Sequence, residues 1–323
     1  ICVLSHVKYD RIIWKIGFME EKMDIRQEIE ELKKEKDAVI LAHYYVRPEI
    51  QEIADHTGDS FYLAQAAEKL ENRIIVFAGV YFMGESAAIL NPDKKVLMPD
   101  ITADCAMAHM ASPEAIEDMR RKYEDLAVVC YINSSAELKA CSDVCVTSSN
   151  ALKIVESLPN KNIFFIPDKN LGRFIAEKLP DKHFIFNDGF CPIHEKMKAE
   201  EVAELKRLHP SAMILAHPEC NSLICGMADY IGSTAGIIKY ASESSDAEFI
   251  ICTENGVRYE LLKNSPDKKF YFPHTEPVCM DMKLITLEKI RDVLKMENNE
   301  VTVDKDISER AKKPLLRMLK LGR

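Results

Sequence analysis

An internal repeat constrains the fold of this chain more than any other feature of its sequence. Three segments each begin with an apolar, β-rich run that ends in polar side chains, at 39–45, 128–133 and 213–219. A second apolar run follows in each segment, at 73–79, 162–167 and 248–253. The second run leads through a helical pattern and a short third run to a cysteine. This order predicts buried strands that alternate with helices in three copies of one unit.

The spacing of three landmarks supports a triplication. The landmarks are a polar residue at the end of the first strand, a hydroxyl residue where a helix begins, and a loop cysteine. They are His43, Tyr131 and His217; Ser60, Ser148 and Thr234; and Cys105, Cys191 and Cys279. Successive copies lie 88 or 86 residues apart for every landmark. Any parallel α/β protein alternates strands and helices, but alternation alone does not produce matched intervals.

Alternating strands and helices predict parallel βαβ units with right-handed crossovers. We therefore expect an α/β fold of three pseudo-threefold-related, three-layer αβα domains, with parallel sheets around a central active site. The expected domains are 24–108, completed by the C-terminal residues 283–323, then 109–195 and 196–282. A helical pattern begins near Asp24, and the sequence opens with Ile1 rather than Met. Residues 1–23 are therefore interpreted either as a native N-terminal extension or as upstream sequence.

The landmarks predict a central pocket, because parallel sheets bind ligands beyond the carboxyl ends of their strands. The strand-end landmarks lie there, and a helix start offers free N–H groups and partial positive charge to an anion. We expect a small ligand with several negative charges. A lone serine at a helix start is usually only a cap, and a lone strand-end histidine is usually structural. Recurrence at matched intervals favours the functional interpretation.

The three loop cysteines are candidate metal ligands. Each follows a short strand and lies in a loop, where packing explains a cysteine poorly. Cys130 and Cys252 lie inside apolar runs and are interpreted as core residues. No C-x-x-C pair is present, so a zinc ribbon is not predicted. Three converging thiolates suit an iron–sulfur cluster or a zinc ion, and the residues leave this choice open. In a 4Fe–4S cluster, three thiolates would leave one iron open as a Lewis acid.

Charge and hydropathy exclude two classes of partner. The net charge of −9 would repel a phosphate backbone, so nucleic acid is not an expected partner. No apolar run approaches the roughly 18 residues that a membrane span needs. The first 18 residues are interrupted by charges and do not resemble a signal peptide. We expect a cytoplasmic protein that does not bind a membrane.

Nine motifs resemble those of the quinolinate synthase A family, iron–sulfur enzymes of NAD biosynthesis. The resemblance extends from about Asp24 to the C-terminus. The motifs are ILAHYY at 40–45, IADHTGDS at 53–60, ILNPDK at 89–94, YINS at 131–134, PDKNLG at 167–172, CPIH at 191–194, HPEC at 217–220, GST at 232–234 and AKKPLLRM at 311–318. Four positions depart from the family pattern without removing a ligand: Tyr44, Tyr81, Gly84 and Phe190.

The resemblance implies a transferase that condenses iminosuccinate with dihydroxyacetone phosphate to quinolinate, releasing phosphate and water. It also implies a 4Fe–4S cluster on Cys105, Cys191 and Cys279, and a functional link to an aspartate oxidase or aspartate dehydrogenase that makes the imine. The substrate-binding residues that it implies are His43, Ser60, Tyr131, Ile132, Asn133, Ser148, His217, Pro218, Glu219 and Thr234.

Chemical type suggests roles for the site residues. His43, Ser60, Ser148 and Thr234 are expected to bind carboxylate or phosphate oxygens, and Tyr131 and Asn133 to donate hydrogen bonds. Glu219 and Tyr45 are the candidates for proton transfer, and Tyr131 is a third catalytic candidate that can donate a hydrogen bond. His194 is expected beside the cluster. Two alternatives stay open: a zinc-dependent aldolase or hydrolase on a small anionic substrate, and a dicarboxylate-binding iron–sulfur sensor without turnover.

Overall fold

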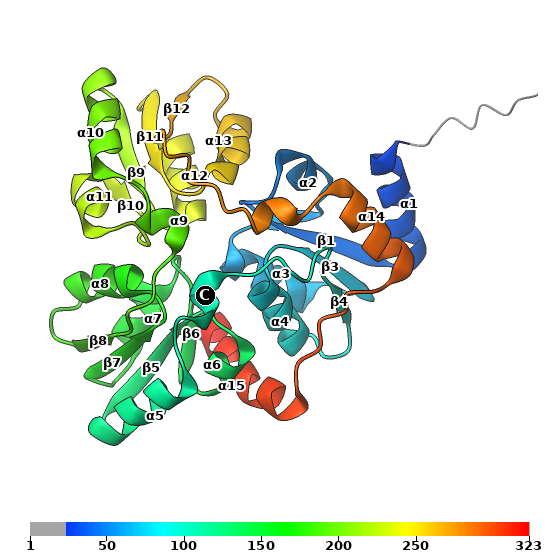
Figure 1. Ribbon diagram of the computed structural model, residues 1–323, viewed down its shortest axis with the longest axis horizontal. Helices are drawn as coiled ribbons and strands as arrows, with labels where there is room; N and C mark the ends of the chain where they lie inside the picture. Colours follow the sequence, from blue (N-terminus) through cyan, green and yellow to red (C-terminus); the bar gives the residue numbers. More distant parts are fainter. Residues whose placement is uncertain (1–23, 323) are drawn as a thin grey trace, which may run out of the picture.

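Three α/β units surround a common centre in the structure, a computed structural model that describes residues 24–322 (Figure 1). Each unit contains one four-stranded sheet whose strands all pair in parallel. The predicted α/β class with parallel sheets is thereby confirmed. The predicted extension at 1–23 lies outside the described residues. None of the helices in the described part is both long and apolar enough to cross a membrane.

The first unit begins with the helix predicted near Asp24, whose carboxylate accepts a hydrogen bond from the Arg26 backbone N–H and caps the helix. The strands of this unit are β1 (Ala38–His43), β2 (His56–Gly58), β3 (Ile74–Ala78) and β4 (Lys95–Leu97). Its helices are α1 (Ile25–Lys36), α2 (Pro48–Ile53), α3 (Ser60–Lys69) and α4 (Tyr81–Leu90). Helices α1 and α2 cover one face of the sheet, and α3 and α4 cover the other (Figure 1).

The second unit repeats this arrangement. Its strands are β5 (Leu126–Tyr131), β6 (Val144–Val146), β7 (Asn162–Ile166) and β8 (His183–Phe186). Its helices are η1 (Ala106–His109), α5 (Pro113–Lys122), α6 (Ala136–Ala140), α7 (Ala151–Ser157) and α8 (Lys169–Lys178). Helices α7 and α8 pack against each other on one face, opposite α5.

The third unit follows a short helix, α9 (Pro192–Glu195), at its junction with the second unit. Its strands are β9 (Met213–Ala216), β10 (Tyr230–Ile231), β11 (Glu248–Cys252) and β12 (Lys269–Tyr271). Its helices are α10 (Ala199–Leu208), α11 (Ser222–Met227), α12 (Thr234–Glu243), η2 (Asn255–Val257) and α13 (Arg258–Asn264). Helices α10 and α11 pack together, as do α12 and α13.

The three sheets have the same strand order: β2-β1-β3-β4, β6-β5-β7-β8 and β10-β9-β11-β12. One hydrogen-bond pair also recurs in all of them. The carboxylates of Asp55, Asp143 and Asp229 accept from the backbone N–H groups of Ile40, Val128 and Ile214, at 2.8, 2.7 and 2.8 Å. These aspartates are 88 and 86 residues apart, so the repeat in the sequence corresponds to a repeat of local structure.

The short edge strands β2, β6 and β10 lie just before the predicted helix starts and were not predicted from the sequence. They contain two or three residues each, too few for an alternating pattern to be recognised. The helix caps also differ from the prediction. Asp59 caps α3 and Ser233 caps α12, each one residue before the predicted landmark, and Ser148 lies in the turn that precedes α7.

The last helices are η3 (Met282–Leu284), α14 (Leu287–Met296) and α15 (Lys305–Leu321). Helix α14 packs against α1 and β3 of the first unit. Helix α15 packs against α4 of the first unit but more extensively against α6 and β6 of the second. The C-terminal segment therefore joins the first two units, whereas the prediction assigned all of 283–323 to the first.

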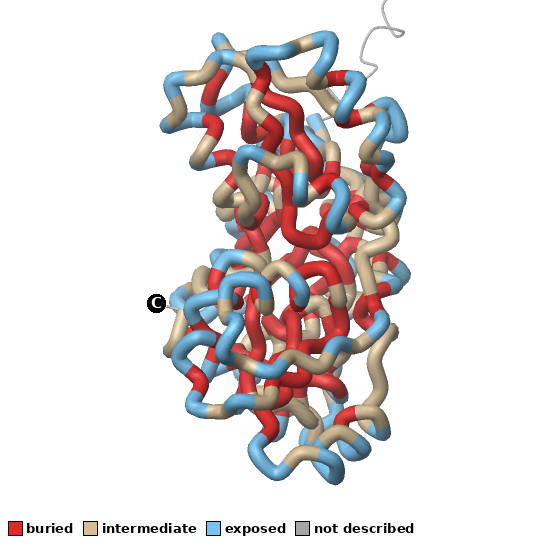
Figure 2. The backbone as a smooth tube through the Cα atoms, turned by 90° about the vertical axis from the view of Figure 1, so that its left-hand side faces the viewer, coloured by how far each residue is buried: buried red, intermediate tan, exposed pale blue. Residues whose placement is uncertain are grey.

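Buried residues run through the middle of the molecule, and exposed residues lie on the outer helices (Figure 2). The first and second units share one continuous apolar core. In the third unit the apolar side chains form two layers, one on each face of the sheet. Neighbouring residues of β9 separate accordingly, with Ile214 in one layer and Leu215 in the other, as the two-residue period of a strand requires.

Candidate active site

A cavity at the carboxyl ends of the strands receives side chains from all three units. It is lined by thirteen of the residues that the sequence analysis singled out: His43, Tyr45, Ser60, Cys105, Tyr131, Asn133, Ser148, Cys191, His194, His217, Glu219, Thr234 and Cys279. Ile132 and Pro218 are buried beside it but do not line it. The four departures from the family pattern do not line it either. The functional roles of all these residues stay predictions.

The first strands of the three units position the polar residues at the centre. His43 and Tyr131 are the last residues of β1 and β5, and His217 directly follows β9. Two residues further along the chain stand a phenol, an amide and a carboxylate, on Tyr45, Asn133 and Glu219, at intervals of 88 and 86 residues. One repeated backbone position thus presents three different functional groups to one cavity.

The two strand-end histidines are neutral hydrogen-bond donors. Nδ1 of His43 accepts from the Tyr45 backbone N–H at 3.2 Å, and Nδ1 of His217 accepts from the Glu219 backbone N–H at 3.3 Å. Burial lowers the pKa of His43 to about 3 and that of His217 to about 4. A neutral imidazole that accepts at Nδ1 carries its proton on Nε2. Both rings can therefore donate from Nε2 to an oxygen atom.

We expect His43 to make the protein less stable in acid. Its folded-state pKa of about 3 lies below the unfolded value of 6.5, so the unfolded chain binds the proton first. Its contribution to stability is present above pH 6.5 and is lost as the pH falls towards 3. Between pH 7 and pH 5 this loss is about 2 kcal/mol. Urea unfolding at both pH values should show a loss smaller by about that amount in His43→Asn, and an equal loss in both proteins would contradict this prediction.

Ser60 and Thr234 do not cap their helices, because the preceding residue is the N-cap in each case. The Asp59 carboxylate accepts from the Tyr62 N–H, and the Ser233 hydroxyl accepts from the Gly236 N–H. Ser60 and Thr234, the first residues of α3 and α12, are thereby left to line the cavity. The Thr234 hydroxyl lies 2.7 Å from the Tyr45 hydroxyl.

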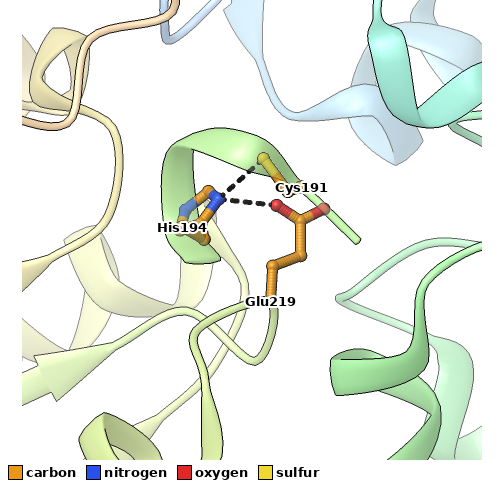
Figure 3. A group of neighbouring side chains, drawn as sticks. All are labelled: Cys191, His194 and Glu219. Atoms are coloured by element: carbon orange, nitrogen blue, oxygen red, sulfur yellow. Dashed lines mark hydrogen bonds and ion pairs between the residues drawn. The ribbon is translucent and has the colours of Figure 1, made fainter. Parts of the chain in front are cut away.

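Glu219 is a buried carboxylate that pairs with His194 (Figure 3), and His217 lies nearby. The Glu219 Oε2 atom lies 2.8 Å from His194 Nδ1 and 3.6 Å from His217 Nδ1. Burial opposes ionisation of this carboxyl, but the electrostatic effect of the nearby His217 and His194, together with hydrogen bonds from His194 and Tyr131, lowers its pKa to about 2. Burial, with the charge of Glu219, raises the pKa of both Tyr45 and Tyr131 well above the ordinary value. The cavity therefore combines an ionised carboxylate with two protonated phenols.

The three loop cysteines line the same cavity, and in each case a carboxylate holds the loop. The backbone N–H of Cys105 donates to Asp104 at 2.8 Å, that of Cys191 to Asp168 at 3.2 Å, and that of Cys279 to Glu254 at 3.0 Å. The sequence analysis assigned no role to these carboxylates. Asp168 and Glu254 are 86 residues apart, so the register of the repeat could have identified this pair.

The cavity contains donors suited to a metal. Within residues 24–322, one set of three side chains brings its ligand atoms within 4.8 Å of one another: Cys191, His194 and Glu219 (Figure 3). The three cysteine sulfurs do not form such a set. A single zinc ion binds thiolates at about 2.3 Å, so three sulfurs on one ion would lie closer together than this. Wider spacing in one cavity is compatible with a metal cluster.

Comparisons with known proteins agree with one another. The family model described as "Quinolinate synthetase A protein" matches residues 27–320. A quinolinate synthase of Clostridioides difficile is 53% identical over 299 residues, covering 93% of this chain and 98% of the relative. One of Fusobacterium nucleatum is 52% identical, covering 92% of this chain and 99% of the relative. One of Aquifex aeolicus is 46% identical, covering 94% and 96%.

Proposed function

The chain belongs to the quinolinate synthetase A family, and from this premise we propose that it is a quinolinate synthase of NAD biosynthesis. It condenses iminosuccinate with dihydroxyacetone phosphate to quinolinate and releases phosphate and water. One observation carries this proposal. All three units contribute to one cavity a cysteine and polar side chains that can bind carboxylate or phosphate oxygen atoms. Both substrates are small and anionic, and the neutral donors His43, Ser60 and Thr234 in the cavity lining could bind their oxygen atoms. An aspartate oxidase or aspartate dehydrogenase supplies the imine.

Cys105, Cys191 and Cys279 would hold a 4Fe–4S cluster. The donor set fits, because three thiols from three loops line one cavity. Burial raises the pKa of Cys105 to about 12 and that of Cys279 to about 11, so these thiols stay protonated until a metal displaces the protons. With three protein ligands, such a cluster would leave one iron open, which would supply Lewis-acid chemistry at a substrate oxygen.

The polar residues divide into binding and proton-transfer groups. His43, Ser60, Ser148 and Thr234 bind carboxylate or phosphate oxygens. The neutral state of His43, which can donate from Nε2, supports this assignment. Tyr131 and Asn133 donate further hydrogen bonds, and His217 donates in the same way as His43. Ile132 and Pro218 support this wall of the cavity from behind.

Glu219 and Tyr45 transfer protons in the imine–enamine and dehydration steps. Glu219 is ionised and can therefore accept a proton, and Tyr45 keeps its proton and can therefore donate one. Both groups line the cavity, so both can reach a bound substrate.

The same proposal includes the arrangement of the three domains and the cellular location of the protein. The three units are domains related by a pseudo-threefold axis, with boundaries near residues 108, 195 and 282. Their identical strand order supports this relation. The protein acts in the cytoplasm and uses neither nucleic acid nor a membrane.

An anaerobic assay with both substrates tests the proposed function. The purified protein is expected to be brown, to contain about four iron atoms per chain and to form quinolinate. A colourless protein with stoichiometric zinc would favour the aldolase or hydrolase alternative. A brown protein that binds a dicarboxylate without forming product would favour the sensor.

A further inference from the structure

A continuous series of hydrogen bonds joins the two proposed proton-transfer residues through His194, which lines the cavity, and Thr253, which does not. The Thr234 hydroxyl lies 2.7 Å from the Tyr45 hydroxyl, which lies 2.9 Å from the Thr253 hydroxyl. Thr253 lies 3.0 Å from His194 Nε2, and His194 Nδ1 lies 2.8 Å from Glu219. Every one of these distances is that of a good hydrogen bond. Tyr45 and Glu219 are thus connected although they come from different units.

The fold does not require a hydroxyl group at the position of Thr253, the residue that connects Tyr45 to His194. Thr253 directly follows β11, is fully buried and does not line the cavity. By the intervals of the repeat, its equivalents in the first and second units are Gly79 and Pro167. Neither has a side-chain hydroxyl, so the strand end folds without one. The Thr253 hydroxyl therefore serves its hydrogen bonds to Tyr45 and His194 rather than the folding of the strand end.

His194 is equally specific to its unit. It stands three residues after Cys191, and its equivalents after Cys105 and Cys279 are Ala108 and Met282. The ring is buried; its Nδ1 lies 2.8 Å from Glu219 and 3.2 Å from the Cys191 sulfur, and its Nε2 lies 3.0 Å from Thr253 (Figure 3). The two members of the series that lie between Tyr45 and Glu219 are therefore both departures from the repeat.

The hydrogen bonds in this series all have the same direction, with each group donating to the next one towards Glu219. The Glu219 carboxylate accepts, so His194 donates from Nδ1, and in the tautomer with its single proton at Nδ1 the Nε2 atom accepts. Thr253 must donate to Nε2 and accept from the Tyr45 hydroxyl. Tyr45 in turn accepts from Thr234. A proton can shift along such a series without rotation of any group.

We propose that Thr253 is a positioning residue whose hydroxyl makes Tyr45 and Glu219 one proton-transfer unit; this inference rests on the proposed function. As Tyr45 takes a proton from the substrate, its own proton passes to Thr253. The Thr253 proton passes to His194 Nε2, and the Nδ1 proton passes to Glu219. One proton leaves the substrate, Glu219 gains one, and the charge of the His194 ring does not change. The reverse shift returns the proton when water leaves.

The test replaces the hydroxyl while keeping the shape of the side chain. Thr253→Val should lower kcat by about 10²-fold, the usual contribution of a proton-transfer group, and leave KM nearly unchanged. Thr253→Ser restores a hydroxyl and should recover kcat to within a few-fold of the wild type. Each holoenzyme is purified anaerobically and checked for iron content and visible absorption. Thr57→Val is the matched control: Thr57 lies in β2, its hydroxyl bonds to the Gln51 carbonyl, and it does not line the cavity.

A double variant adds a second readout. If Tyr45 and Thr253 act in one series, Tyr45→Phe combined with Thr253→Val should cost no more in kcat than the larger single loss. Multiplicative losses would overturn the relay. Full turnover in Thr253→Val, or a change confined to KM, would also overturn the relay. Equal losses of kcat in the valine and serine variants would overturn it too, because they would show that the side chain acts through packing. Absence of quinolinate from the wild-type reaction would overturn the proposed function and the relay with it, whereas these other results overturn the relay alone.

Discussion

Cys191→Ala is expected to abolish both the iron–sulfur cluster and quinolinate formation. The substitution removes one of three proposed thiolate ligands, and the two that remain come from other loops and cannot hold the cluster. The backbone bond from residue 191 to Asp168 does not depend on the side chain, so the loop itself should persist. Iron per chain, visible absorption and anaerobic turnover measure the result. The same substitution at Cys105 or Cys279 should have the same effect.

Cys141→Ala provides the matched control. Cys141 follows α6, is partly buried and does not line the cavity. This variant should keep its full iron content and its full rate of quinolinate formation. Wild-type iron content and turnover in Cys191→Ala would refute the assignment of this ligand, whatever the control does.

Glu219→Gln is expected to lower kcat by about 10³-fold while the cluster stays in place. Glutamine has nearly the same shape, and its amide oxygen can still accept from His194, but it cannot take up a proton. The negative charge that makes this group a base is lost. Anaerobic turnover, with iron content measured on the same sample, separates a loss of proton transfer from a loss of the cluster.

Glu260→Gln tests whether any buried glutamate gives this effect. Glu260 lies in α13, is nearly as buried as Glu219, and bonds to Lys263 and Asn264 away from the cavity. Its replacement should leave kcat unchanged. Full turnover by a cluster-containing Glu219→Gln enzyme would remove Glu219 from the proton-transfer steps.

The sequence predicted most of the fold because its long buried strands have clear apolar runs and because three copies strengthen each weak signal. Strand β7, for example, covers all but the last residue of the predicted run at 162–167. The edge strands were not predicted, because two or three residues are too few to show an alternating pattern of apolar and polar side chains. In the site, landmarks that recur were recognisable. Thr253 was not, because its equivalents are Gly79 and Pro167 and its partners are distant in sequence.

The packing of the C-terminal segment shows a second limit of the sequence. The amphipathic pattern of α15 identifies a helix, but it does not say which neighbour the apolar side covers. In the structure that side meets both the first and the second unit. Contacts between elements far apart in the chain are decided by the complementary shapes of whole surfaces, which no local pattern encodes.

Tyr45, Asn133 and Glu219 occupy one backbone position in three copies of the same framework. With the pseudo-threefold axis proposed above, three identical side chains here would let a molecule bind in three equally favourable orientations. A phenol, an amide and a carboxylate make the three walls chemically distinct. An unsymmetrical ligand is then expected to have a single preferred orientation, because each of the three walls offers it a different chemical group.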